Sequence, residues 1–327
     1  MIDVALIGAG RIGKIHGANL ARQPGVRLRW VCDAVGAAAE ELARAVGSAA
    51  CDLERALGAD VQAVVIASST DTHAELILRA AAERKAIFCE KPVDLALARA
   101  RECAAAVARA GVPCVVGFQR RYDPTFAALE RRLDAGEIGA PEVLAITSRD
   151  PGAPPVDYLR RSGGVFKDML IHDFDLCRWL LRDEAAVVFA AASCLTDPSI
   201  EEAGDADTTA VTIRTRKGRL CQINTSRRAA YGYDQRLEVL GAGGMLAAGN
   251  HRPTEVSAHL PGAISSDPPE PFFLERYRAA YAAEMLHFAA VLRGEAQPRT
   301  TIDDGVRALE IAEAATRSWR EGRAVAP

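Results

Sequence analysis

The residues best suited to chemistry begin with a glycine-rich turn near the start of the chain. Gly8, Gly10 and Gly13 match the pattern G-x-G-x-x-G between an apolar run and a helical pattern. The first glycine permits a tight turn, the second lets the backbone approach a pyrophosphate, and the third allows close packing of helix and strand. Free N–H groups at the helix start favour phosphate. We expect Gly8, Gly10, Arg11, Ile12 and Gly13 to bind a dinucleotide.

An acidic residue follows at the distance that a dinucleotide site requires. Asp33 lies twenty positions after Gly13, at the end of a second apolar run. Its carboxylate can accept hydrogen bonds from the adenosine ribose hydroxyls and would repel the 2′-phosphate of NADP. No arginine follows it directly. The sequence therefore predicts NAD, the alternative being a structural glycine turn with an acidic residue by chance.

A lysine follows another apolar run. Lys91 comes directly after Ala86–Glu90. Ligands of open α/β sheets bind beyond the carboxyl ends of the strands, so we expect Lys91 to point toward the cofactor. A surface lysine, with Pro92 ending the strand, explains the position equally well.

A later helical pattern carries a polar face with an unusual composition. At about 100° per residue, Asp168, His172, Asp175 and Trp179 share a narrow arc of a helix predicted over Val165–Arg182. A solvated face is normally rich in Lys, Glu and Arg, and this one is not. Asp168 and His172 stand four residues apart and can touch. An aspartate bound to one imidazole nitrogen leaves the other as a general base. A structural Asp–His pair is the alternative.

A metal site is not expected. A catalytic zinc requires three protein ligands, and the histidines other than His172 show no ligand-like spacing. His16 is interpreted as structural, and His73 as the start of a helix near the cofactor. No two of the eight cysteines form a C-x-x-C pair, so a thiolate zinc site or redox dithiol is not expected either.

Composition excludes some classes of function. The 327 residues carry a net charge of −3, which gives no support for binding nucleic acid or an anionic membrane surface. No apolar stretch is long enough to span a bilayer, and no signal peptide precedes the first strand. Cysteines within apolar runs suit a reducing compartment. We expect a cytoplasmic protein.

The elements that must position these residues fall into two groups. Short apolar strands alternate with helices in the first third, which predicts a doubly wound parallel sheet. These strands are expected at Val4–Gly8, Leu28–Asp33, Ala63–Ser68, Ala86–Glu90 and Cys114–Gly117. Later strands follow one another directly, with a hairpin turn at Lys217-Gly218, which predicts a mostly antiparallel sheet in an α+β domain. We expect an α/β protein with an NAD-binding domain at 1–120 and a substrate-binding and oligomerisation domain at 121–327. The C-terminal helix at 303–320 is a candidate to pack back on the first domain.

These residues together resemble the glucose-fructose oxidoreductase/inositol dehydrogenase/MocA (Gfo/Idh/MocA) family over nearly the whole chain. The likeness rests on GAGRIGKIH, Asp33, the segment Ser69-Thr70-Asp71-Thr72-His73, Phe88-Cys89-Glu90-Lys91-Pro92 and the spacing Asp168-x-x-x-His172. Within the family the chain looks most like bacterial inositol 2-dehydrogenases. Ser148-Arg149-Asp150-Pro151, SGGVFKDMLIHDFDLCRWL, Tyr231-Gly232-Tyr233-Asp234 and Tyr281 carry that closer likeness.

The resemblance implies a Rossmann domain, a large open sheet that packs across subunits as a homotetramer, and oxidation of myo-inositol to its 2-keto compound. Lys91, Asp168 and His172 would be catalytic, with His172 as general base and Lys91 stabilising alkoxide charge. Ser68, Thr70, His73, Glu90 and Lys91 would join the glycine turn and Asp33 in the cofactor site. The other substrate hydroxyls would be held by Arg121, Asp150, Asp175, Tyr233 and Tyr281.

Two other functions remain open from the sequence. One is a dehydrogenase of scyllo-inositol, D-chiro-inositol or a pyranose sugar, since these rings differ by single hydroxyl centres. The other is a catalytically silent NAD-binding regulator, because a fold does not dictate a function. The presence of both Lys91 and His172 argues against the regulator.

Overall fold

The computed structural model describes residues 1–327 and divides them into two compact units. Unit 1 comprises Met1–Asp123 and Ala279–Leu309, and unit 2 comprises Pro124–Arg278 and Glu310–Pro327. The first break therefore lies close to the boundary expected after residue 120. Residues 279–309 also belong to unit 1, and of these the sequence indicated only the start of the C-terminal helix expected at 303–320.

Unit 1 is built on a six-stranded, fully parallel sheet with the order β3-β2-β1-β4-β5-β6. Its strands are β1 (Ile2–Ile7), β2 (Val26–Cys32), β3 (Ala49–Ala50), β4 (Ala63–Ile66), β5 (Ala86–Glu90) and β6 (Cys114–Gly117). β4 is buried throughout, as a strand covered on both faces should be. This is the strand order of a dinucleotide-binding fold, and it confirms the predicted doubly wound sheet.

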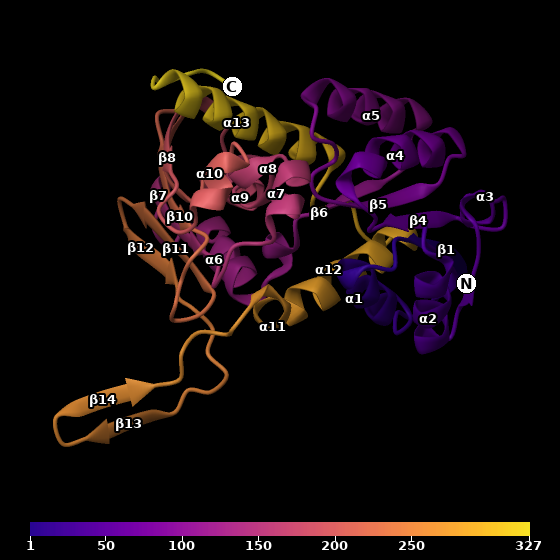
Figure 1. Cartoon of the computed structure of the whole chain (residues 1–327), viewed down its shortest axis with the longest axis horizontal. Helices are drawn as coiled ribbons and strands as arrows, with labels where there is room; N and C mark the ends of the chain where they lie inside the picture. The colour runs from indigo at the N-terminus through magenta and orange to yellow at the C-terminus, as the bar shows by residue number, and fades with distance from the viewer. The chain divides into compact units, whose positions relative to one another are not determined.

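Helices cover both faces of this sheet (Figure 1). They are α1 (Arg11–Leu20), α2 (Gly36–Val46), α3 (Leu53–Ala56), α4 (His73–Ala82), α5 (Leu97–Ala110) and α12 (Arg278–Leu292), with 3-10 turns η1 (Thr70–Thr72) and η2 (Gln119–Tyr122). Apolar residues of α12 pack into the same core as β1 and β5, with Met285 and Phe288 fully buried beside Leu6 and Phe88. This packing explains why the segment belongs to unit 1.

Unit 2 is built on a second six-stranded sheet with the order β12-β11-β7-β10-β9-β8. Its strands are β7 (Pro141–Arg149), β8 (Ala185–Ser193), β9 (Thr208–Thr215), β10 (Leu220–Ser226), β11 (Asp234–Gly241) and β12 (Gly244–Ala248). Only β7 and β10 pair in parallel, so the expected mostly antiparallel sheet is confirmed. Gly218, at φ +85°, forms the predicted turn between β9 and β10.

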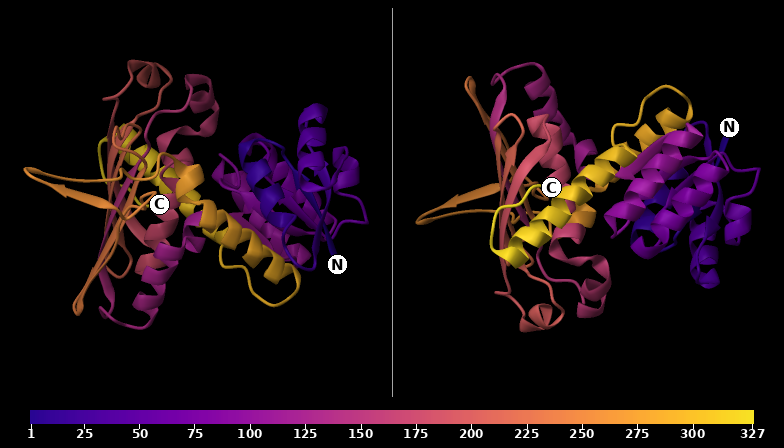
Figure 2. Two further views of the ribbon diagram at one scale, coloured as in Figure 1. Left: turned by 90° about the horizontal axis from the view of Figure 1, so that it is seen from below. Right: turned by 90° about the horizontal axis from the view of Figure 1, so that it is seen from above.

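Helices lie on one face of this sheet and leave the other open (Figure 2). They are α6 (Pro124–Asp134), α7 (Val156–Ser162), α8 (Gly164–Asp168), α9 (Ile171–Leu181), α10 (Pro198–Glu202), α11 (Phe273–Arg276) and α13 (Ile302–Glu321), of which α13 begins in unit 1. A hairpin of β13 (Ser257–Leu260) and β14 (Ala263–Ser266) projects away from the sheet (Figure 1). No helix combines the length and the apolar character needed to cross a membrane.

The prediction of one continuous helix over Val165–Arg182 is wrong. The helix is interrupted at Met169–Leu170, between α8 and α9. The carbonyl of Val165 accepts hydrogen bonds from the N–H groups of both Met169 and Leu170, so the turn is widened. Such wide turns inside helices are frequent at functional sites. Here the interruption lies between the two predicted catalytic residues, Asp168 and His172.

A buried aspartate organises the loop between β8 and β9. Asp207 accepts hydrogen bonds from the N–H groups of Leu195 and Thr196 and from the hydroxyls of Thr196 and Thr208. Burial alone would raise the pKa of Asp207, but these hydrogen bonds outweigh it and lower the pKa from 3.8 to about 2. The folded protein therefore favours the charged form.

We expect Asp207→Asn to lower the free energy of unfolding by about 1–3 kcal/mol at neutral pH, because amide hydrogens would face N–H donors. The depressed pKa stabilises the fold above pH 3.8, and this contribution is lost as the pH falls toward about 2. Thermal unfolding at several pH values checks this: the difference between wild type and variant should shrink in that window. The exposed Asp157, changed to Asn, is the control, and a pH-independent difference would contradict the expectation.

Candidate active site

The glycine turn after β1 has the geometry that its sequence predicts. Gly8 has φ +106°, and a Cβ atom there would lie 2.5 Å from the backbone of Ala67. A Cβ on Gly13 would lie 1.9 Å from the Gly8 carbonyl oxygen, so turn and helix must touch. Gly10 differs, because its Cβ would meet nothing within 4 Å. Its lack of a side chain leaves open space beside the N-terminus of α1, which fits a pyrophosphate bound there.

Asp33 lies against this turn. Its Oδ2 accepts a hydrogen bond from the N–H of Ala9 at 2.6 Å, and its Oδ1 accepts one from the N–H of Val35 at 2.8 Å. The carboxylate thus bridges the end of β2 and the glycine turn after β1. This places the predicted ribose-binding group directly beside the predicted pyrophosphate-binding group.

The segment after β4 contributes a buried histidine. His73 is 1% exposed, and its ring nitrogens lie 2.8 Å from the carbonyl oxygen of Pro92 and 3.1 Å from that of Ser68. Burial lowers the pKa of His73, although both carbonyls favour the charged ring. The ring therefore connects the ends of β4 and β5. The hydroxyls of Ser68 and Thr72 lie 2.6 Å apart in the same segment, which also contains Thr70.

Glu90 and Lys91 lie at the carboxyl end of β5. The Oε1 of Glu90 is 2.6 Å from the Nε2 of His16 on α1. Lys91 is partly buried, and its peptide bond to Pro92 is cis. In unit 1 the structure therefore gathers Gly8, Asp33, Ser68 and Lys91 at one edge, because each follows a parallel strand of the same sheet.

The predicted catalytic pair lies in unit 2 on the interrupted helix. Asp168 ends α8, and His172 is the second residue of α9; both are partly buried. The Oδ1 of Asp168 accepts a hydrogen bond from the Tyr158 hydroxyl at 2.9 Å. Its Oδ2 lies 3.5 Å from a guanidinium nitrogen of Arg227. Tyr158 and Arg227 thus hold the carboxylate from two sides.

Arg227 is a site residue that the sequence analysis missed. It directly follows β10, is 1% exposed, and also lies 3.8 Å from the carboxylate of Asp205. This buried guanidinium therefore helps to hold the Asp168 carboxylate in one position. The sequence indicated Arg227 only as an arginine immediately after a predicted strand. Its partner Asp168 is too distant in sequence for the pairing to be recognised.

Two predicted substrate residues lie at the same edge of the second sheet as Arg227. Asp150 follows β7, and Tyr233 precedes β11. The strand register pairs Arg149 with both Ser226 and Asp234, so Asp150, Arg227 and Tyr233 share this edge. Tyr233 is buried, and its ring forms T-shaped contacts with the rings of Phe272 and Tyr277.

The three remaining predicted substrate residues are buried, two of them in unit 1 and one in unit 2. Arg121 in unit 1 lies 3.0 Å from the carboxylate of Asp304 and donates a hydrogen bond to the carbonyl of Arg299. Tyr281, also in unit 1, forms a T-shaped ring contact with His16. Asp175 lies on α9 of unit 2 and is 1% exposed.

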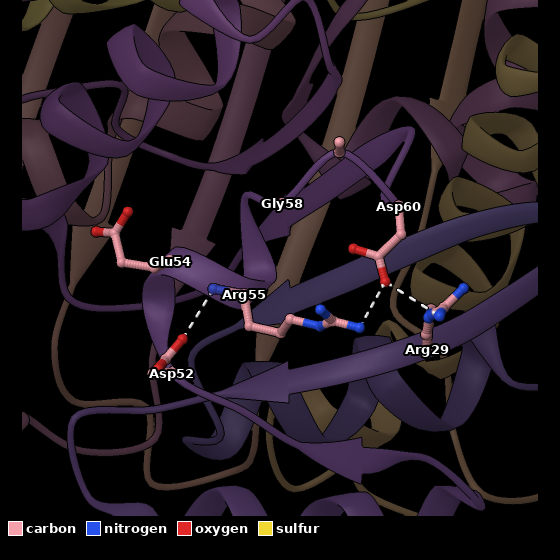
Figure 3. A pocket seen from close by; sticks show the side chains of 7 residues that line it. Arg29, Asp52, Glu54, Arg55, Gly58 and Asp60 are labelled. Carbon is pink, nitrogen blue, oxygen red and sulfur yellow. Dashed lines mark hydrogen bonds and ion pairs between the residues drawn. The ribbon is translucent and has the colours of Figure 1, made fainter.

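A depression of about 590 Å³ on unit 1 contains none of the predicted site residues (Figure 3). Its two arginines share one partner, since Arg29 and Arg55 each lie 3.1 Å from one carboxylate oxygen of Asp60. The other lining residues are Asp52, Glu54, Gly58 and Ala59. The depression shares no lining residue with the glycine turn, so we do not assign it to the cofactor site.

Two models of one protein family together match nearly the whole chain. The NAD-binding Rossmann-fold model of an oxidoreductase family, GFO_IDH_MocA, matches residues 2–118, and the C-terminal alpha/beta domain model of that family matches residues 130–326. An inositol 2-dehydrogenase of Rhizobium meliloti is 46% identical over 99% of this chain and 98% of its own length. A scyllo-inositol 2-dehydrogenase (NAD(+)) of Bacillus subtilis is 38% identical over 99% and 96%.

A solved structure shows the same fold with ligands. A scyllo-inositol dehydrogenase of Lactobacillus casei, with bound NAD(H) and scyllo-inositol, superposes with a TM-score of 0.92 at 26% identity, covering 100% of this chain and 99% of that chain. The glycine turn and Asp33 fit the same cofactor here. The chain therefore belongs to the Gfo/Idh/MocA oxidoreductase family and is an NAD-dependent oxidoreductase.

Proposed function

We propose that this enzyme oxidises a CH–OH group of myo-inositol, giving 2-keto-myo-inositol and NADH. The observation that carries the proposal is the 46% identity to an inositol 2-dehydrogenase over essentially both chains. The partly buried Asp168–His172 segment and the strand-end Lys91 supply the groups that oxidation of an alcohol needs. Bound NAD would supply the hydride acceptor.

His172 acts in this proposal as the general base that takes the hydroxyl proton on one ring nitrogen, while Asp168 orients the imidazole. Asp168 fixes the tautomer of the imidazole and balances the positive charge that forms on it. The contacts of Asp168 with Tyr158 and Arg227 support this role, because they hold its carboxylate in one place. Lys91 donates a hydrogen bond to the reacting oxygen and stabilises its developing negative charge.

The remaining hydroxyls of the ring need donors and acceptors of their own. We assign this role to Arg121, Asp150, Asp175, Tyr233 and Tyr281. A site that pairs every hydroxyl rejects rings that leave a buried partner unpaired. The cofactor would be held by the backbone of the glycine turn with Arg11 and Ile12, by Asp33 at the ribose, and by the segment around Ser68, Thr70, His73, Glu90 and Lys91.

A substrate panel tests the proposal. Initial rates of NADH formation would be compared for myo-, scyllo- and D-chiro-inositol and for glucose, as kcat/KM with NAD. We expect myo-inositol to rank first. A last rank for myo-inositol would overturn the substrate assignment, and no turnover on any polyol would overturn the enzymatic proposal in favour of an NAD-binding regulator.

Oxidation of scyllo-inositol is the second candidate. It is favoured by the 38% identity to an NAD-linked scyllo-inositol 2-dehydrogenase and by the close superposition on a structure that holds that isomer. The two isomers differ at one hydroxyl, axial or equatorial, and the same panel separates them. A first rank for scyllo-inositol would select this candidate.

We also propose that the enzyme is a homo-oligomer, a tetramer by family resemblance, joined through the open face of the second sheet. The register places Leu220, Val143, Leu240 and Met245 side by side on four adjacent strands. Leu220, Leu240 and Met245 are 41%, 45% and 51% exposed in the single chain. A continuous exposed apolar row of this kind is typical of an interface.

Leu240→Glu is expected to shift the protein toward smaller species, because it places a charge within this row. Light scattering coupled to size-exclusion chromatography measures the mass directly. Leu195, which is 66% exposed and lies outside the row, gives the matched Leu→Glu control. A monomeric wild type, or a Leu240→Glu variant of unchanged mass, would overturn the proposed interface.

A reducing, cytoplasmic location fits the same picture. All eight cysteines are free, and six of them are buried. Burial raises the pKa of Cys103 to about 12, which keeps this thiol protonated and unreactive. We therefore assign the cysteines a packing role.

A further inference from the structure

A buried acidic residue in unit 1 has no part in the reaction described above. Glu284 lies in the middle of α12 and is fully buried. Neither of its carboxyl oxygens has a hydrogen-bond partner among the side chains around it. An uncompensated buried carboxylate is costly, so its charge state or its partner needs an explanation.

Glu284 faces two other ionisable residues. A ring nitrogen of His16 on α1, an oxygen of Glu90 at the end of β5 and an oxygen of Glu284 all lie within 4.8 Å of one another. His16 is fully buried, and it contacts Glu90 at 2.6 Å. Tyr122 on η2 is a further ionisable neighbour of Glu284, and its hydroxyl lies 3.1 Å from that of Thr300. The buried cluster thus joins α1, β5 and α12.

Glu90 is the member of the cluster nearest to the proposed chemistry. It immediately precedes Lys91, and its carboxylate also lies against β6, where a Cβ on Gly117 would be 2.9 Å from Oε2. His16, Gly117 and Glu284 therefore surround this carboxylate within unit 1. Glu90 is thus held from three elements directly beside the residue that carries the Lys91 side chain.

Two adjacent buried carboxyl groups cannot both be ionised at low cost. Burial, and then the negative charge of Glu90, raise the pKa of Glu284 well above its ordinary value. Glu90 is the less buried of the two carboxyl groups, and it contacts an imidazole nitrogen that can donate a hydrogen bond to it. A proton on Glu284 would convert two facing acceptors into a donor and an acceptor.

We propose that Glu284 is a protonated positioning residue, whose carboxylic acid shares its proton with Glu90 and, together with His16, fixes the strand end that carries Lys91. The link to Lys91 rests on the proposed function, whereas the protonation of Glu284 does not. Glu284 touches neither substrate nor cofactor in this proposal. It acts by holding Glu90.

A divalent metal ion is the rival occupant of this cluster. One imidazole and two carboxylates suit such an ion by ligand type. Two ligands at about 2.0–2.1 Å from a tetrahedral ion lie roughly 3.3 Å apart. The 2.6 Å contact between His16 and Glu90 is shorter than that, and it matches a direct hydrogen bond. The observed arrangement therefore suits a proton better.

Infrared spectroscopy of the full-length protein at neutral pH tests the protonation. We expect a carbonyl band of a protonated carboxyl group in the wild type, and its loss in Glu284→Gln. Glu295 is exposed and paired with Arg293, which lowers its pKa, so Glu295→Gln should leave the band unchanged. An identical spectrum for wild type and Glu284→Gln would overturn the proposal, whatever the substrate is.

Kinetics tests the positioning role. Glu284→Leu is expected to lower kcat about 10-fold with less change in the KM for NAD, because a misplaced group costs rate more than binding. Glu284→Gln keeps a neutral donor and should restore most of the lost rate. Equal losses in the two variants, or none in Glu284→Leu, would overturn this role. One equivalent of Zn²⁺ or Mn²⁺ retained by wild type after dialysis, and absent from Glu284→Gln, would overturn the proposal in favour of a metal.

The dependence of stability on pH gives a readout without substrate. A raised pKa in the folded state means that the native protein holds a proton that the unfolded chain releases, so stability falls as the pH rises above the ordinary value of 4.5. The stability of Glu284→Gln relative to wild type should therefore increase from acidic to neutral pH. A constant difference would count against a protonated Glu284.

Discussion

Replacing His172 by Ala is expected to lower kcat on the order of 10²-fold or more, while NAD still binds. The loss follows from removing the base that takes the hydroxyl proton, and no other imidazole of unit 2 lies on α8 or α9. The glycine turn and Asp33 belong to unit 1 and do not depend on this side chain. Steady-state rates with a polyol, together with titration of NAD by its effect on protein fluorescence, separate the two effects.

A second histidine of the same unit provides the control. His259 lies on the exposed β13, so His259→Ala should keep wild-type rates. Partial recovery of His172→Ala by added imidazole would further support loss of a base rather than loss of shape. Unchanged turnover of His172→Ala would remove His172 from the mechanism and would leave Asp168 with a structural role only.

The fold was predictable where local chemistry determines it. The glycine turn needs a positive φ at Gly8 and close contact at Gly13, and both requirements follow from the residue type. Short apolar strands alternating with helices led to the parallel sheet, and the alternating strands joined at Lys217-Gly218 led to the antiparallel one. These patterns repeat over a few residues, so they can be recognised in a single sequence.

The interruption between α8 and α9 could not be predicted in this way. Residues 165–182 contain neither Pro nor an internal Gly, and their pattern suits a continuous helix. The break is made by the shared carbonyl of Val165. The backbone of this segment is held by a residue distant in sequence, since Asp205 accepts a hydrogen bond from the N–H of Val165. Tertiary contacts thus override the local preference.

Arg227 and Glu284 were missed for a related reason. Each derives its role from a group distant in sequence: Asp168 for Arg227, and Glu90 with His16 for Glu284. α12 is apolar around most of its circumference, so its periodicity does not reveal which face meets the first sheet. Contacts between distant segments decide these placements, and no short spacing encodes them.

Replacing Asp33 by Ala is expected to weaken NAD binding by roughly 10- to 10²-fold, the range for losing hydrogen bonds to a charged group. It should also lower the preference for NAD over NADP, because the carboxylate that repels the 2′-phosphate is gone. NADP should not become the better cofactor, since Ala34, Val35 and Gly36 supply no cation for the phosphate. The ratio of kcat/KM for the two cofactors measures this change.

The contacts of Asp33 require a finer comparison, because its carboxylate also accepts hydrogen bonds from Ala9 and Val35. Asp33→Asn removes the charge but keeps one acceptor oxygen, so it should lower the NAD preference while weakening NAD binding less than Asp33→Ala. Asp303→Ala, an exposed change in the same unit, should alter neither quantity. If Asp33→Asn and Asp33→Ala both kept the wild-type cofactor ratio, repulsion of the phosphate by Asp33 would not be the source of NAD specificity. If only Asp33→Ala changed the ratio, the loss would lie in the shape of the glycine turn, which Asp33 holds through Ala9.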